Sequence, residues 1–294
     1  MRFSLPSISP LALLAPLALG VVAYCGSRHA SRATDSKPAV SKASPYASPT
    51  ALVICPDQRH ALVALSAANA VSVIDLQAVR HNASRLARAA GGAELMAVVK
   101  ANGYGHGIVE VARVLEREGI DYLGVAEIPE ALELRLAGVK TPVLTWLHDP
   151  TEDFVNAIAQ NVDIGVSNLE QLERIAQAAA QVGQPARLHL KLDTGLGRNG
   201  AAPTEWPALF SRVLELVEQN LAVAVAIFSH LSCTSAEDDR AQIALFNSAF
   251  QAAEATGLAG LIRHLTASDG SISYPEAHFD MVRIGVSLYG LSPF

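Results

Sequence analysis

The chain has 294 residues, of which 50% are hydrophobic and 17% charged, so it carries enough apolar material for one large domain or two ordinary ones. Its formal net charge is −6, and a mildly acidic chain lacks the basic surface typical of nucleic-acid-binding proteins, so we expect no nucleic-acid partner. The three cysteines, Cys25, Cys55 and Cys233, are odd in number and show no CxxC or other metal-ligand spacing. Neither a disulfide framework nor a bound metal is expected.

The first 70 residues differ in composition from the rest. An apolar run from Leu11 to Tyr24 follows Arg2; it is short for a membrane span but typical of the core of an export signal. Residues 1–26 are therefore either a signal or anchor segment or an extension without a targeting role. The first interpretation places the protein in the periplasm or at the envelope, with a membrane contact, and the second places it in the cytoplasm. Residues 27–70 begin with a stretch rich in Ser, Ala, Lys and Pro, which predicts a disordered linker.

From about Val71, short apolar runs rich in β-formers alternate with segments of helical period. Two of those segments, Ile108 to Arg117 and Asn168 to Ala180, place apolar residues on one helical stripe. Alternating strands and helices predict an α/β protein with a parallel sheet, because parallel neighbours need a long crossover between them. The runs predict eight strands: Leu95–Val99, Tyr122–Ala126, Pro142–Leu147, Val162–Val166, Arg187–Leu192, Ala222–Phe228, Ile262–Ala267 and Val282–Leu288.

Eight such strands favour a closed (β/α)8 barrel of the TIM type over residues 71–294. Phe294 lies six residues after the last predicted strand, and no crossover helix follows it. We therefore expect a barrel that is truncated after its eighth strand.

The segment from Ala97 to Gly107 has the strongest chemical signal. A predicted strand ends at Lys100, and a turn with three alternating glycines follows, containing Tyr104 and His106. A partly desolvated lysine at the mouth of a barrel has a lowered pKa and can act as an amine nucleophile, and glycines let backbone approach a phosphate closely. On spacing alone, an ordinary solvated lysine at a strand end is an equally good interpretation.

The same segment resembles the cofactor-lysine signature of the alanine racemase family, except that Gly103 stands where alanine is common. Further segments resemble this family in the same order along about Val71 to Phe294. They are Ile74–Leu76 with His81 and Asn82, Leu190–Arg198, Phe228–Leu231, Phe279–Gly285 and Leu288–Leu291. The resemblance implies a fold-type III barrel that binds pyridoxal 5'-phosphate.

The resemblance also implies roles for individual residues. Lys100 is expected to hold the cofactor covalently and to act as one of two acid/base groups at the substrate α-carbon. Tyr104 and Ser268, with the backbone of Gly285 and Val286, are expected to bind the phosphate, in agreement with the usual phosphate sites after strands seven and eight of such barrels. Ala267 stands where the family usually has asparagine, so one hydrogen bond to the cofactor is expected to be missing.

By the same resemblance, Arg283 faces the pyridine nitrogen of the cofactor. Because arginine does not give up its proton, that nitrogen stays unprotonated and the ring is a weaker electron sink, which favours racemisation over other chemistry. His230 is expected to orient Arg283. Arg198 is expected near the phenolic oxygen of the cofactor and the substrate carboxylate. Without the resemblance, the residues alone favour a salt bridge of Arg283 with Asp280 or Glu276 at the barrel rim.

Lys191 has two interpretations. Strand alternation puts His189, Lys191 and Asp193 on one face, which can point into the barrel, where an uncompensated lysine charge is costly. In the family, the matching lysine is often carbamylated, which makes it an anion able to hold Arg198. A plain Lys191–Asp193 pair is the alternative.

The resemblance implies a racemase, an isomerase that interconverts L-alanine and D-alanine for cell-wall precursor supply and works as a homodimer on this small amino-acid substrate. The family's second base is a tyrosine on a C-terminal β-domain, and no tyrosine here, including Tyr274 and Tyr289, matches it. Two alternatives stay open: a barrel that binds pyridoxal phosphate with little or no turnover, and a racemase of another or broader specificity. An aldolase or decarboxylase is disfavoured by the racemase-like stretch from Val282 to Gly285.

Overall fold

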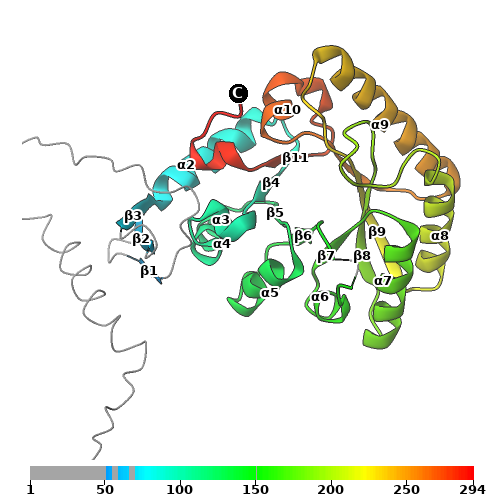
Figure 1. The fold of residues 1–294 in the computed structure, drawn as a ribbon, viewed down its shortest axis with the longest axis horizontal. Coiled ribbons are helices and arrows are strands. Elements are labelled where there is room, and N and C mark those ends of the chain that lie inside the picture. Colours follow the sequence, from blue (N-terminus) through cyan, green and yellow to red (C-terminus); the bar gives the residue numbers. More distant parts are fainter. Residues whose placement is uncertain (1–50, 55–58, 66–69, 150) are drawn as a thin grey trace, which may run out of the picture. The chain divides into compact units, whose positions relative to one another are not determined.

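The computed structural model describes residues 51–54, 59–65, 70–149 and 151–294 (Figure 1). The expected signal or anchor segment, residues 1–26, lies outside these ranges. Within them, no helix is long and apolar enough to cross a membrane. The chain divides into two compact units, residues 1–77 and 78–294.

The first unit contains a three-stranded antiparallel sheet in the order β1 (Ala51–Ile54), β2 (His60–Leu65) and β3 (Ala70–Asp75). Ala51 pairs with Ala64, and Ala61 pairs with Ile74. The prediction of a linker over residues 27–70 is therefore wrong for β1 and β2. Both strands are short runs of Val, Leu, Ile and Ala, which suit a pleated surface, but the Ser- and Pro-rich composition upstream had outweighed this local signal.

The second unit is a closed barrel of eight parallel strands, as predicted (Figure 1). The strands succeed one another around the barrel in chain order, and β11 closes it by pairing with β4. The last predicted strand was too long, because the chain turns at Gly285 into a 3-10 helix, η3 (Val286–Tyr289). The strands are β4 (Glu94–Val98), β5 (Tyr122–Val125), β6 (Val143–Thr145), β7 (Asp163–Val166), β8 (Ala186–Lys191), β9 (Ala222–Phe228), β10 (Ile262–His264) and β11 (Met281–Ile284).

Helices surround the barrel (Figure 1). In α4, the predicted stripe of Ile108, Val111, Ala112 and Leu115 is buried. In α7, the side chain of Asn168 accepts a hydrogen bond from the amide of Gln171 and caps the helix, as the sequence indicates. The helices are α2 (Leu76–Ala89), α3 (Lys100–Tyr104), α4 (Ile108–Arg117), α5 (Ile128–Leu136), α6 (Val155–Ala159), α7 (Leu169–Val182), α8 (Trp206–Glu218), α9 (Ala236–Thr256), α10 (Ser268–Ser273) and η2 (Pro275–Ala277).

Helix α2 connects the two ends of the barrel sequence. It precedes the first barrel strand, yet the Asn82 side chain donates a hydrogen bond to the carbonyl of Leu288, in η3, at 3.0 Å. Just beyond the helix, the Ala90 carbonyl lies 3.1 Å from Nδ1 of His278. The segment before the first strand is thus held against the segment that surrounds the last one.

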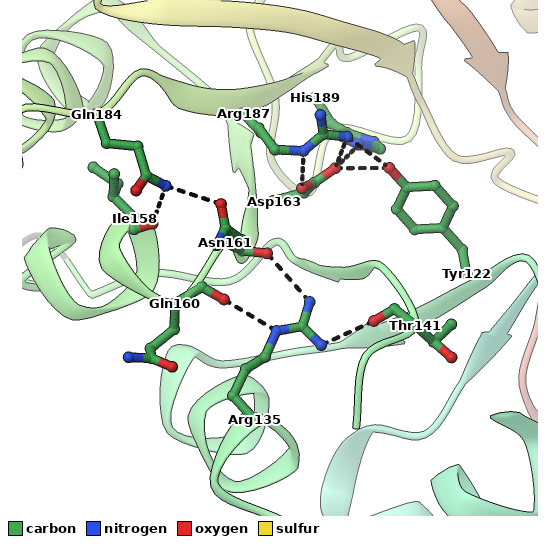
Figure 2. Close-up of polar contacts among 10 residues, drawn as sticks. All are labelled: Tyr122, Arg135, Thr141, Ile158, Gln160, Asn161, Asp163, Gln184, Arg187 and His189. Atoms are coloured by element: carbon green, nitrogen blue, oxygen red, sulfur yellow. Dashed lines mark hydrogen bonds and ion pairs between the residues drawn. The ribbon is translucent and has the colours of Figure 1, made fainter. Parts of the chain in front are cut away.

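Arg135, on α5, ties together the loops that lead into β6 and β7. Its guanidinium donates to the carbonyls of Val139, Thr141, Gln160 and Asn161, at 2.9 to 3.2 Å, and Figure 2 shows three of these contacts. Loop carbonyls without a strand partner need such a donor when they are removed from water. Arg135 thereby sets where the two strands begin.

Candidate functional site

All nine side chains and backbone positions predicted to form a site line one cavity of about 430 Å³. They come from the carboxyl ends of the strands and the segments that follow them, which is where barrel enzymes carry their active sites. A larger cavity of about 620 Å³, which shares Trp146 with the first, contains none of the nine. The nine are Lys100, Tyr104, Lys191, Arg198, His230, Ser268, Arg283, Gly285 and Val286.

Lys100 is placed by an unusual turn. Residues 101–104 all have φ between 52° and 63°, so Ala101, Asn102 and Tyr104 are left-handed as well as Gly103. A left-handed conformation costs roughly 1–2 kcal/mol for each non-glycine residue. The Asn102 carboxamide oxygen accepts from the amide of Ile108 at 2.9 Å, and the Asn102 amide donates to Glu130 at 3.1 Å. The surrounding contacts therefore hold residues 101–104, directly after Lys100, in a conformation that an isolated turn would avoid.

Tyr104, Ser268 and Gly285 form a cradle of polar donors. The amide of Gly285 donates to the hydroxyl oxygen of Ser268 at 3.1 Å, and a Cβ built on Gly285 would overlap the Tyr104 hydroxyl. Burial raises the pKa of Tyr104, so its hydroxyl keeps its proton. The cradle thus offers two hydroxyls at a point where only glycine fits, and the Gly285 amide beside them donates to the Ser268 hydroxyl.

Arg283 is buried and donates from both terminal nitrogens. Nη1 donates to the carbonyl and to Nδ1 of His264, at 2.9 and 3.1 Å. Nη2 donates to the carbonyls of Ser229 and Leu265, at 2.8 and 2.9 Å, and approaches Nδ1 of His230 at 3.3 Å. Burial, followed by the charge of Arg198, lowers the pKa of Arg283 to about 9. Its donors are thus directed by backbone and imidazole acceptors.

The salt bridge of Arg283 at the rim, which the residues alone favoured, is wrong. Asp280 instead pairs with Arg263 at 2.9 Å, and in the described part of the chain no ion pair includes Arg283. The side chain of Arg283, within β11, points into the barrel, whereas Asp280 comes before this strand, so the two side chains do not meet.

His230 is an uncharged acceptor beside Arg283. Burial, then the charges of Arg283, Arg198, Lys191 and Lys100, lower its pKa to about 3. A neutral imidazole can accept from the guanidinium through Nδ1, so His230 lies where the resemblance expects it to orient Arg283.

Lys191 is buried inside the barrel, as strand alternation predicts, with Nζ 5.7 Å from the centre of the Phe228 ring. Burial is the main cause that lowers its pKa, to about 7, followed by Arg283, Arg198 and Lys100. Asp193 accepts instead from the amides of Gly195 and Gly197. Over the residues that the structure covers, no ion pair joins Lys191 to Asp193, so the geometry does not support the plain pairing.

Trp146 is a site residue that the sequence did not single out. It follows β6 and lines the cavity, and it is flanked by glycines on both neighbouring strands. A Cβ on Gly124 would lie 2.8 Å from the Trp146 ring, and one on Gly165 would lie 3.0 Å from its Cβ. Glycines at matching positions of two predicted strands were the available signal, because they leave room for a large side chain between them.

Comparisons with known proteins agree with this geometry. Residues 74–293 match the family model described as alanine racemase, N-terminal domain. An alanine racemase of Frankia casuarinae is 46% identical over 225 residues, 76% of this chain and 59% of that protein. One of Thermobifida fusca is 40% identical over 223 residues, which are 75% of this chain and 60% of that protein.

Solved structures give the same result. The crystal structure of alanine racemase from D-cycloserine-producing Streptomyces lavendulae matches with a TM-score of 0.73 at 38% identity, over 74% of this chain and 58% of that one. The chain therefore spans about 60% of the length of these relatives. The matched residues include the whole barrel and every residue of the candidate site, and the chain belongs to the alanine racemase N-terminal domain family.

Proposed function

We propose that this chain forms the pyridoxal-phosphate-binding barrel of an amino-acid racemase, an isomerase that interconverts L-alanine and D-alanine. The observation that carries the proposal is one cavity of about 430 Å³ that joins Lys100, Arg283 and the Tyr104–Ser268–Gly285 cradle. The relatives named alanine racemase support alanine as the substrate. Supply of D-alanine for cell-wall precursors is the role we propose for the product.

The charges of the cavity fit an anionic cofactor. Its lining carries four cationic side chains, Lys100, Lys191, Arg198 and Arg283, and one acidic side chain, Asp269. Hydroxyl and amide donors of the cradle suit a phosphate, which accepts several hydrogen bonds at once. Bound there, pyridoxal phosphate would supply an electron sink for the substrate α-carbanion.

We assign the residues as follows. Lys100 holds the cofactor covalently and moves a proton at the substrate α-carbon. Tyr104, Ser268 and the backbone of Gly285 and Val286 bind the phosphate.

Arg283 would face the ring nitrogen of bound pyridoxal phosphate and donate it a hydrogen bond but no proton, which would leave the cofactor a weaker electron sink and favour racemisation over other chemistry. His230 positions Arg283 through the contact of Nδ1 with Nη2.

We further propose that Lys191 is carbamylated. A pKa of about 7 leaves a large uncharged fraction at neutral pH, and the uncharged amine is the form that reacts with carbon dioxide. The carbamate is an anion among the cations of the cavity, and it can hold Arg198 near the substrate carboxylate and the phenolic oxygen of the cofactor.

Racemisation needs an acid/base group on each face of the α-carbon. Lys100 serves one face in this proposal. By resemblance to the family, a tyrosine of a partner subunit's C-terminal β-domain serves the other face. A homodimer is therefore part of the proposal.

Reconstitution of the purified chain with pyridoxal phosphate tests cofactor binding. We expect a visible absorption band from covalently bound cofactor, which Lys100→Ala abolishes and Lys140→Ala, an exposed lysine, preserves. If the parent chain shows no band, the proposed site is wrong.

Incubation with D-alanine in deuterated water tests the reaction. Formation of L-alanine supports a racemase, and parallel reactions with serine and lysine measure specificity. Because the proposal takes the second acid/base group from a C-terminal β-domain, we expect this chain by itself to exchange the α-proton with little racemisation. No exchange at the α-carbon would favour a cofactor-binding barrel without turnover.

A further inference from the structure

A row of four polar side chains crosses the interior of the barrel, from the start of β7 to β11. Asp163 Oδ2 lies 3.1 Å from His189 Nε2, and His189 Nδ1 lies 3.0 Å from His264 Nε2. His264 Nδ1 in turn lies 3.1 Å from Arg283 Nη1. All four are at most 5% exposed, so these atoms must satisfy one another rather than water. The two histidines in the middle of this chain of contacts, His189 and His264, are called the histidine row below.

The hydrogen count along this row has one solution. A guanidinium only donates, so Nδ1 of His264 is an acceptor and its hydrogen sits on Nε2. That hydrogen points at Nδ1 of His189, which must accept it. The remaining hydrogen of His189 is then on Nε2, and Asp163 accepts it as a carboxylate.

We propose that Asp163 is a positioning residue for Arg283: its carboxylate fixes both members of the histidine row as neutral Nε2–H tautomers, so that His264 presents an acceptor to the guanidinium. Any other arrangement leaves a mismatch. Were Asp163 a donor, His189 Nε2 would accept and Nδ1–H would face His264 Nε2. His264 would then meet a donor at each nitrogen, and a neutral imidazole can accept at only one of them.

Three groups keep Asp163 a carboxylate, and Figure 2 shows them converging on it. Arg187 donates through Nε at 2.7 Å and Nη2 at 3.2 Å, and the Tyr122 hydroxyl donates at 2.7 Å. Burial acts to raise the pKa of Asp163, but the hydrogen bond from His189 and the hydrogen bonds and charge of Arg187 act against it, and the pKa stays below its usual value. Burial, Asp163 and the bond to it raise the pKa of Tyr122, which therefore stays a donor.

The other end of the row is equally constrained. Phe228 stacks on His264, with ring centres 4.6 Å apart and planes 7° apart, and the Arg283 guanidinium carbon is 5.5 Å from the same ring. Burial, then the charge of Arg283, lower the pKa of His264 well below its usual value, so it stays neutral. The charged or titratable neighbours at this end are Arg198, Lys191 and His230, and without carbamylation of Lys191 none of them offers Arg283 an anion.

Nitrogen-15 NMR of the histidine side chains tests the proposal in the chain without cofactor, so its outcome does not depend on the proposed function. We expect His189 and His264, assigned with His189→Gln and His264→Gln variants, to be neutral Nε2–H tautomers at neutral pH. An Nδ1–H tautomer or an imidazolium at either position would overturn the proposal. This measurement on the parent chain is decisive even if a variant does not fold.

Asp163→Leu supplies the matched perturbation, with Tyr122→Phe as its control. Leucine removes both acceptor oxygens, whereas Tyr122→Phe removes a donor to Asp163 and leaves the histidine row intact. We expect at least one histidine of the row to change tautomer in D163L and neither to do so in Y122F. Unchanged tautomers in a folded D163L would also overturn the proposal.

The consequence for the cofactor rests on the proposed function. After reconstitution, we expect the visible band to be independent of pH between about pH 6 and 8 in the parent and in Y122F, and to become pH-dependent in D163L. A band that is absent from the parent refutes the proposed function alone. A band that behaves alike in all three refutes the positioning role.

Discussion

The hydroxyl of Tyr104 occupies the space where a side chain on Gly285 would begin. The two residues belong to opposite ends of the barrel sequence, yet they meet at the cradle that Ser268 completes through its bond with the Gly285 amide. Glycine is required here by close approach, since its φ of −112° is accessible to any residue. Residue 285 is therefore a glycine because the Tyr104 hydroxyl fills the space that a larger side chain would need.

We predict that Gly285→Ala weakens binding of pyridoxal phosphate on the order of tenfold, which corresponds to about 1.4 kcal/mol. The added methyl group displaces the Tyr104 hydroxyl from the cradle. Pyridoxal, which lacks the phosphate, is the matched probe, and its affinity should change much less. Tyr104→Phe should reproduce the phosphate-selective part of the loss. Equal losses for the two ligands would contradict the assignment of this cradle to phosphate.

Lys191 predicts a stability that depends on pH. Its pKa is about 7 in the folded chain against 10.5 for an ordinary lysine, so between these values the unfolded chain binds more protons. The free energy of unfolding contributed by this group therefore rises as pH increases from about 7. In urea titrations without carbon dioxide, Lys191→Met should flatten this rise, and Lys140→Met, at an exposed position, should not. An identical pH slope in parent and K191M would show that burial does not destabilise the charged amine.

Carbamylation of Lys191 gives a separate prediction. With carbon-13-labelled bicarbonate near neutral pH, we expect one protected carbamate signal in the NMR spectrum of the folded chain. Lys191→Met should remove it and Lys100→Met should leave it. A signal that persists in K191M would place the carbamate on another amine.

Arg135 does not line the cavity, but we expect its removal to lower the stability of the fold strongly. Its guanidinium satisfies four backbone carbonyls, so Arg135→Ala should lower the free energy of unfolding by on the order of 2–3 kcal/mol. Arg113 is the control, because it is more exposed and donates to a single carbonyl, that of Ala137. Arg113→Ala should cost less than about 1 kcal/mol. Denaturation of the two variants side by side checks this, and similar losses would mean that the four contacts contribute little.

The barrel could be predicted because it depends on local patterns, whereas most of the nine residues of its cavity were predicted from the resemblance to the alanine racemase family. Eight apolar runs separated by helical segments define a closed parallel sheet, and residues at the carboxyl ends of such strands meet at one mouth. Lys191 followed from simple alternation along β8. The sheet of β1 to β3 was missed because two short apolar runs lay close to a polar, Ser- and Pro-rich segment.

Contacts across the barrel could not be predicted in the same way. Asp163 stands in an otherwise apolar strand, which signals a buried partner, but nothing local says which strand supplies it. Asp163 reaches the neighbouring strand β8, whereas His189 reaches across to β10. The left-handed turn after Lys100 was equally hidden, since Ala101 and Asn102 have no intrinsic preference strong enough to predict it.

Trp146 gives the last prediction, through its contact with Gly124. A Cβ at Gly124 would lie 2.8 Å from the Trp146 ring and 3.0 Å from the sulfur of Met96, so Gly124→Ala should lower the free energy of unfolding by about 1–3 kcal/mol. If the indole is the main obstacle, Trp146→Leu should make room for the methyl group. The double variant should then be more stable than the sum of the two single losses allows, by at least about 0.5 kcal/mol. Additive losses in a double-mutant cycle would instead assign the strain to Met96, which comes from the other neighbouring strand.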